Sequence, residues 1–296
     1  MSHQYIRVEV ENGRCRITLD RPDKRNALAD PLLAELEEAI WEADDRKDVH
    51  CVILRGAGRD FCAGYDLAGT GREPEAGRRD GRSIDDDIWL LERNNRRIRS
   101  LFEMHKPSIA QVHGHCLAGG TDLALACDMI VAADDARIGF PPARNLGALP
   151  NNLWIYHCGP QWAKRLTLTG DSILGTDAQK IGLVMKAVPA EHLEQEVEQL
   201  ADRLALIDPD LLAANKRIVN LALELMGAQT LQRLAAENDA RGHRAPGTKA
   251  YFQAVAEKGL RQAFRERDAQ FGDSLVRVDG PEIRDARGFL VDGEQD

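Results

Sequence analysis

The residues most able to do chemistry lie in the stretch 113–128, whose sequence is HGHCLAGGTDLALACD. A short apolar run at 108–112 precedes it, and apolar residues recur at helical spacing after Gly120. This pattern predicts a strand, a tight turn and a helix N-terminus. The first amides of a helix lack internal partners and lie at the positive end of its dipole. The turn at Gly119 and Gly120 can therefore hold a developing negative charge on its backbone N–H groups.

Asp122 falls in the first turn of that predicted helix. Its carboxyl group is within reach of whatever the turn amides bind, so it can serve as a general acid or base. Acidic residues are also common in first helical turns because they offset the helix dipole. On this stretch alone, both roles for Asp122 remain open.

A second turn of the same kind follows the predicted buried strand at 49–54. Residues 55–67 read RGAGRDFCAGYDL, which again places glycines and exposed backbone amides at the end of a strand. Two turns that each offer an N–H can hold one oxygen atom from two sides. The pair therefore favours a catalytic role for Asp122.

A loop with three cations lies earlier in the chain, at residues 21–28, and reads RPDKRNAL. Such a run is commonly a solvated turn. Lysine and arginine are also the usual partners of phosphate groups, so the loop is a candidate phosphate clamp.

The elements that must position these turns follow from periodicity. Residues 5–19 alternate around Asn12-Gly13 and predict a β-hairpin, and residues 84–104 predict a long helix. An all-helical tail is predicted at 191–207, 211–225, 229–240 and 248–267. Residues 68–83, rich in Gly, Arg, Pro, Glu and Asp, cannot bury a core and predict either a lid over the site or a disordered insertion.

Composition narrows the class of protein. The 296 residues suit either one large domain or one domain plus a helical appendage, and the net charge of −9 disfavours nucleic acid as the main ligand. We expect no membrane span and no secretory signal, because no apolar run approaches about 20 residues. The six cysteines are scattered without zinc-ligand spacing, so we expect buried thiols in a reducing cytoplasm and no metal site.

Four segments together resemble the crotonase superfamily, the enoyl-CoA hydratase/isomerase proteins. The segments are 17–28, 52–67, 106–128 and 136–150, and the resemblance covers roughly residues 5–270. It implies an α/β fold, a spiral of β-β-α turns followed by helices that build a homotrimer or a dimer of trimers. We accordingly expect a core with the acyl-CoA site at 1–205 and a helical region for oligomerisation and active-site cover at 206–296.

Members of that superfamily bind acyl-coenzyme A and polarise the thioester carbonyl with two backbone amides. Carried over by motif, these amides are those of Tyr65 and Gly119. Coenzyme A is then part of the substrate, and no permanently bound cofactor is implied. The residues implied to contact coenzyme A are Lys24, Arg25, Ala27, Ala63, Asp66 and Leu67.

Hydratases of the superfamily use two glutamates to handle water. Asp122 takes the place of the first and is one methylene shorter, while Pro142 stands where the second is expected. Asp122 then needs another partner, or the reaction differs. The candidate partners are Arg144, Asn145 and Tyr65.

The leading hypothesis is therefore a lyase of the enoyl-CoA hydratase type. Hydrolysis or C–C cleavage of an acyl-CoA, with Asp122 activating water, remains open, as does double-bond isomerisation with one mobile base. A non-catalytic protein that binds RNA or acyl-CoA is a further alternative. The acidic helix predicted at 30–45 argues against RNA binding.

Overall fold

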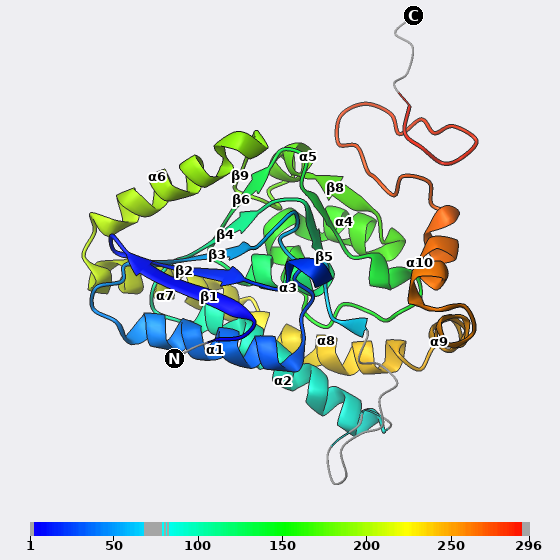
Figure 1. Ribbon diagram of the computed structural model, residues 1–296, viewed down its shortest axis with the longest axis horizontal. Helices are drawn as coiled ribbons and strands as arrows, with labels where there is room; N and C mark the ends of the chain where they lie inside the picture. The colour runs from blue at the N-terminus through cyan, green and yellow to red at the C-terminus, as the bar shows by residue number, and fades with distance from the viewer. Residues whose placement is uncertain (1–2, 68–78, 80, 82, 292–296) are drawn as a thin grey trace, which may run out of the picture.

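The computed structural model describes residues 3–67, 79, 81 and 83–291 (Figure 1). The lid or insertion predicted at 68–83 therefore lies almost wholly outside the described residues. Among the described residues, no helix is both long and apolar enough to span a lipid bilayer.

Six strands form the main sheet in the order β1-β2-β3-β4-β6-β9. β1 pairs antiparallel with β2 through the predicted hairpin, whose turn residues Asn12 and Gly13 have φ of 52° and 77°. All other pairings in this sheet are parallel. The strand bounds are β1 Ile6–Glu11, β2 Arg14–Leu19, β3 Cys51–Gly56, β4 Ser108–Val112, β6 Met129–Ala133 and β9 Lys186–Val188.

A second, smaller sheet has the order β5-β7-β8. Its strands are β5 His115–Leu117, β7 Arg137–Gly139 and β8 Ser172–Leu174. The chain passes from β4 in the main sheet to β5 in the small one, returns as β6 and leaves again as β7. This alternation winds the chain into a spiral and brings the ends of successive strands to one region.

Helices cover both faces of the main sheet. In Figure 1, α1 and α2 lie below it and α6 lies above it, where α6 contacts β3, β4 and β6. Apolar residues of α1 at helical spacing are all buried, which explains why this acidic segment folds as a helix against the sheet. The helix bounds are α1 Asp30–Asp45, α2 Ile84–Glu103, α3 Gly119–Ala126, α4 Trp154–Thr169, α5 Gly175–Lys180 and α6 Leu193–Ala205.

The tail beyond α6 is helical, as predicted. It consists of α7 Pro209–Leu225, α8 Ala228–Gly242, α9 Pro246–Lys258 and α10 Leu260–Ala269. The prediction of a single helix over 248–267 is wrong, because Gly259 adopts φ 82° and ψ 155° and separates α9 from α10. After α10 the chain returns to the small sheet, where Ser172 N–H donates to the Ser274 carbonyl at 2.7 Å. The division of the chain near residue 205 into two domains stays a prediction.

Candidate active site

The turn after β3 lies between two other backbone segments. On one side, the Leu28 amide donates to the Gly64 carbonyl and the Asp66 amide donates to the Leu28 carbonyl, both at 2.8 Å. On the other side, the Leu117 amide at the end of β5 donates to the Cys62 carbonyl at 3.0 Å. These hydrogen bonds place three segments side by side: the cation loop at 21–28, the glycine turn at 55–67 and the start of the stretch 113–128. The prediction that two glycine turns hold one oxygen atom requires this arrangement.

The amides of Tyr65 and Gly119 have no hydrogen-bond partner among the described residues. Tyr65 pairs with Leu28 as in a parallel sheet, and that pairing uses the amides of the neighbouring residues rather than its own. Gly119 is the first residue of α3, where amides lack internal partners. A Cβ built on Gly64 would lie 3.5 Å from the Gly119 nitrogen, so the two turns are in contact.

The turn before α3 is strained. Ala118 has φ 51° and ψ −119°, a conformation that residues with a side chain rarely adopt and that costs about 1–3 kcal/mol. The turn is held by the Ala118 amide, which donates to the Gly139 carbonyl at 2.9 Å, and by the Thr121 hydroxyl, which donates to the Ala118 carbonyl at 2.6 Å. Such strain at a helix start is typical of a site where backbone direction matters.

Gly119 could not carry a side chain without disturbing this arrangement. A Cβ at this position would lie 2.8 Å from Leu28 Cδ1 and 2.9 Å from Tyr65 Cε2. The glycine therefore allows the aromatic ring of Tyr65 to pack directly on the backbone that carries the free amide.

Asp122 is 1% exposed and lies beside Tyr65, whose hydroxyl donates to Asp122 Oδ2 at 3.4 Å. Its Oδ1 is buried without a hydrogen-bond partner among the described residues. Burial, and then the charge of Asp239, raise the pKa of Asp122 well above the usual range, which the Tyr65 hydrogen bond only partly opposes. The surroundings of Asp122 therefore favour its protonated form over the carboxylate.

The predicted coenzyme A contacts gather on the outer side of the same turns. Arg25 is half exposed, with Nε 3.7 Å from Asp60 Oδ2, and its carbonyl accepts from the Ala63 amide at 3.0 Å. Asp66 instead forms an ion pair with Arg21 at 2.7 Å, and the same guanidinium donates to the Ala27 carbonyl. Lys24 is exposed, and Leu67 ends the described part of this segment. Their roles in binding coenzyme A stay predictions.

The chain matches known proteins along most of its length. Residues 9–274 match the family model described as enoyl-CoA hydratase/isomerase. This chain belongs to the enoyl-CoA hydratase/isomerase family. Its fold is the crotonase fold, as predicted, with the helical tail at its C-terminal end.

Three relatives of this family illustrate the match. A putative enoyl-CoA hydratase of Thermus thermophilus is 32% identical and covers 83% of this chain and 97% of its own length. A hydroxycinnamoyl-CoA hydratase-lyase of Pseudomonas fluorescens is 30% identical over 88% of this chain and 96% of its own. The crystal structure of an enoyl-CoA hydratase from Mycobacterium smegmatis is 34% identical, covers 90% of this chain and 93% of that one, and has a TM-score of 0.84.

Arg144, predicted as a partner for Asp122, contacts other residues instead. Its side chain is 3% exposed and donates to Asp171 and Asp268, each at 2.9 Å. It also donates to Ser274 Oγ at 3.0 Å, and its guanidinium carbon lies 3.8 Å from the centre of the Phe271 ring. The structure therefore places Arg144 in a buried ionic cluster that ties the loop after β7 to the helical tail.

Two structural features of the site were missed by sequence reasoning. Asn26 is fully buried at φ 55°, accepts from the Arg21 amide and donates to the carbonyls of Ala57 and Asp60. It therefore fixes the cation loop against the turn after β3. The buried residue Asp239, on α8, was also missed, because nothing near it in the sequence marks it as part of a site.

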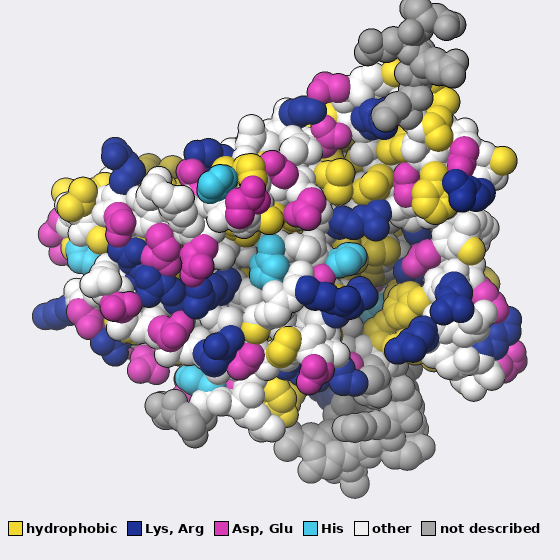
Figure 2. All heavy atoms as spheres, turned by 45° about the horizontal axis from the view of Figure 1, so that its top comes forward, with side chains coloured by type: hydrophobic (Ala, Val, Ile, Leu, Met, Phe, Trp, Pro, Cys, Tyr) yellow, Lys and Arg dark blue, Asp and Glu magenta, His cyan; other side chains and the backbone are white. Residues whose placement is uncertain are grey.

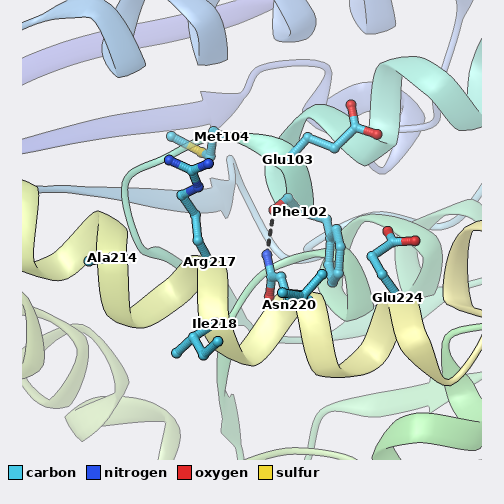
Figure 3. A pocket seen from close by; sticks show the side chains of 9 residues that line it. Phe102, Glu103, Met104, Ala214, Arg217, Ile218, Asn220 and Glu224 are labelled. Atoms are coloured by element: carbon cyan, nitrogen blue, oxygen red, sulfur yellow. Dashed lines mark hydrogen bonds between the residues drawn. The ribbon is translucent and has the colours of Figure 1, made fainter.

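A surface groove lies away from these residues. It has a volume of about 570 Å³, and Figure 3 shows side chains of α2 and α7 around it, with Asn220 donating to the Phe102 carbonyl at 2.8 Å. None of its lining residues is a predicted site residue. On the face shown in Figure 2, basic and acidic side chains alternate, so that face carries no unbroken basic surface for nucleic acid.

Among the described residues, no cluster of three or more His, Cys, Asp or Glu side chains could hold a metal ion. All six cysteines are buried and free. The thiol of Cys62, beside the first glycine turn, has its pKa raised by burial to about 12, so it is not a nucleophile near neutral pH.

Proposed function

We propose that this chain is a lyase of the enoyl-CoA hydratase type, which adds water to the double bond of an enoyl-CoA. The observation that carries the proposal is the pair of partnerless amides, Tyr65 and Gly119, on two turns in contact. Preorganised donors of this kind stabilise the oxyanion that forms when the thioester becomes an enolate, and each contributes about 3–4 kcal/mol in other enzymes.

Asp122 supplies the proton for the carbon next to the thioester. Its pKa is raised by burial and by the charge of Asp239, and both causes favour the acid form. A carboxyl group with a raised pKa, placed beside an oxyanion site, is the usual arrangement for a general acid. The shorter side chain, compared with glutamate, places the proton closer to α3.

Coenzyme A binds as part of the substrate, with the cation loop as the phosphate contact. Lys24 and Arg25 are exposed beside the turn that carries Tyr65, so phosphates bound there would leave the thioester near the two amides. No permanently bound cofactor is needed for this chemistry.

Isomerisation of an enoyl-CoA double bond is the second candidate. The observation that favours it is Pro142, which stands where a second water-handling glutamate is expected. The side chain of a proline has no polar group that could take the place of the carboxyl group. A single carboxyl group suffices to move a proton between two carbons, and no water takes part.

Crotonyl-CoA separates these candidates. A hydratase removes the conjugated double bond, so the ultraviolet absorbance of the enoyl thioester falls and 3-hydroxybutyryl-CoA accumulates. An isomerase leaves crotonyl-CoA unchanged in absorbance but converts a 3-enoyl-CoA into the conjugated isomer. Release of free thiol from either substrate would replace both proposals by hydrolysis.

We also propose that the chain forms a homo-oligomer, either a trimer or a dimer of trimers. Apolar side chains on α7 are more than half exposed in the single chain, which is unusual for a stable surface. They are Leu211, Ile218, Val219, Leu221 and Leu225. The groove of Figure 3 borders the same helix. Light scattering during size-exclusion chromatography tests this, and a monomer mass at micromolar concentration would contradict it.

A further inference from the structure

The site as described has one proton-handling carboxyl group, Asp122, whereas addition of water needs two groups. A second buried carboxyl group lies on α8, in the helical tail. Asp239 is 3% exposed, and its Oδ1 accepts from the Ala148 amide at 2.8 Å.

The loop that follows Pro142 lies directly against this carboxyl group. A Cβ built on Gly147 would lie 2.4 Å from Asp239 Oδ1, and one built on Gly242 would lie 3.0 Å from the Ala148 nitrogen. In the family pattern the second glutamate belongs to this loop. Here the loop carries none, and α8 presents a carboxyl group against it instead.

His243 lies beside Asp239, and Asp87 lies beside His243. His243 Nε2 lies 3.5 Å from Asp239 Oδ1, and His243 Nδ1 lies 2.9 Å from Asp87 Oδ2 on α2. Burial lowers the pKa of His243, but the hydrogen bond to Asp87 and the charges of Asp239 and Asp87 outweigh it, so the pKa is raised. The charged imidazolium favours the ionised form of Asp239.

The two carboxyl groups differ in their surroundings. Burial raises the pKa of Asp239 to about 6, opposed by His243 and the Ala148 amide, and burial together with the charge of Asp239 raises the pKa of Asp122 well above its usual range. The charge of Asp239 contributes to the raised pKa of both Asp122 and Tyr65. Different surroundings are the usual basis on which a carboxyl pair divides the roles of acid and base.

We propose that Asp239 is the second proton-handling residue of the site, supplied by α8 in place of the residue missing at Pro142. This inference rests on the proposed hydratase function. The Asp239 carboxylate removes a proton from water while the water oxygen bonds to the β-carbon. The π electrons move onto the thioester oxygen, and Asp122 then donates its proton to the α-carbon. Exchange with solvent returns the proton from Asp239 and reloads Asp122.

A purely structural role for Asp239, as an anchor for the Ala148 amide, makes a different prediction. Asp239→Asn retains a side-chain oxygen that accepts from that amide, so the anchor survives while the base is lost. Gln232→Met is the matched control, because Gln232 also lies buried on α8 and anchors the same loop through the Asn152 amide at 2.6 Å.

With crotonyl-CoA as substrate, we expect Asp239→Asn to lower kcat about 100-fold with KM within about threefold, as for loss of a general base. Gln232→Met should keep kcat within about fivefold of the wild type. Wild-type kcat in Asp239→Asn would overturn the inference. So would an equal loss in both variants, because loop anchoring would then account for the effect.

The pH profile gives a second readout that does not depend on removing Asp239. The carboxylate must be ionised, so kcat/KM of the wild type should fall as pH drops through about 6. His243→Gln removes the neighbouring positive charge, so the pKa of Asp239 rises and this acid limb moves to higher pH. An acid limb that stays in place in His243→Gln would contradict the inference.

Failure of the inference can be told from failure of the proposed function. Carboxyl ¹³C NMR of the unliganded protein should show that Asp239→Asn lowers the pKa of Asp122, because a neighbouring negative charge is lost. If that shift is present and the wild type hydrates no enoyl-CoA, the proposed function fails and the carboxyl pair stands. If the wild type is active and the shift is absent, the carboxyl pair fails.

Discussion

Asp122 and Arg144 are both buried ionisable side chains that follow a glycine-containing turn, but their surroundings are opposite. Arg144 has two carboxylates, a hydroxyl, a carbonyl and an aromatic ring arranged around its guanidinium group. Asp122 has one hydrogen bond of 3.4 Å and an oxygen without a partner among the described residues. A buried group that is fully satisfied stabilises the fold, whereas one that is left unsatisfied is available to a substrate.

The comparison extends to the backbone around each side chain. Asp122 follows the strained residue Ala118 and the partnerless amide of Gly119, and the partnerless amide of Tyr65 lies on the neighbouring turn. Arg144 lies in a short 3-10 helix, η3 Pro141–Arg144, whose neighbours connect it to α10 and to the chain beyond. Burial alone therefore does not mark a catalytic residue, and the state of its hydrogen bonds separates the two cases.

Gly119→Val gives the sharpest test of the unsatisfied region. The added side chain would collide with Leu28 and the Tyr65 ring and displace the amide, so we expect turnover to fall about 1000-fold, as for loss of an oxyanion donor. Gly247→Val is the matched control, because nothing lies within 4 Å of a Cβ there. Wild-type turnover in Gly119→Val would move the oxyanion site elsewhere.

Asp122→Asn should lower kcat about 100-fold, because the amide cannot donate the acid proton. Binding of a saturated acyl-CoA, measured by calorimetry, should remain close to that of the wild type, since the shape of the site is kept. A fully active Asn variant would show that Asp122 only offsets the dipole of α3. In that case the contrast with Arg144 would disappear.

Arg144→Met should reduce stability rather than chemistry. Loss of the guanidinium leaves Asp171 and Asp268 with fewer partners, so we expect the free energy of unfolding to fall by about 3 kcal/mol. The kcat of the folded fraction should stay near the wild-type value. Arg46→Met, on an exposed ion pair with Asp48, is the control and should leave the melting temperature unchanged. A selective loss of kcat in Arg144→Met would restore Arg144 to the active site.

Arg25→Gln should have the smallest effect, a rise in KM of about tenfold for crotonyl-CoA, because one exposed phosphate contact is lost. The rise should vanish with crotonyl-N-acetylcysteamine, which carries the thioester but no phosphate. An equal rise with both substrates would mean that Arg25 positions the turn through Asp60 and does not bind phosphate.

The sequence determined the local parts of this protein. The Asn12-Gly13 hairpin, the apolar stripe of α1 and the glycine turn before α3 each follow from backbone preferences within a few residues, and the structure confirms them. Within the helical tail, the break at Gly259 was missed because a single glycine interrupts an otherwise helical pattern. The family resemblance also came from such local segments, in their order along the chain.

Only the tertiary structure decided which side chains meet. Ala148 and Asp239 are 91 residues apart, and Arg144 and Asp268 are 124 apart, so neither contact has a signature in the sequence near its partners. The helical tail packs back on the spiral, and this packing places Asp239 against the Ala148 amide and Asp268 against Arg144. Desolvation and charge pairing depend on that packing, because they are set by everything that surrounds a group and not by its neighbours in the chain.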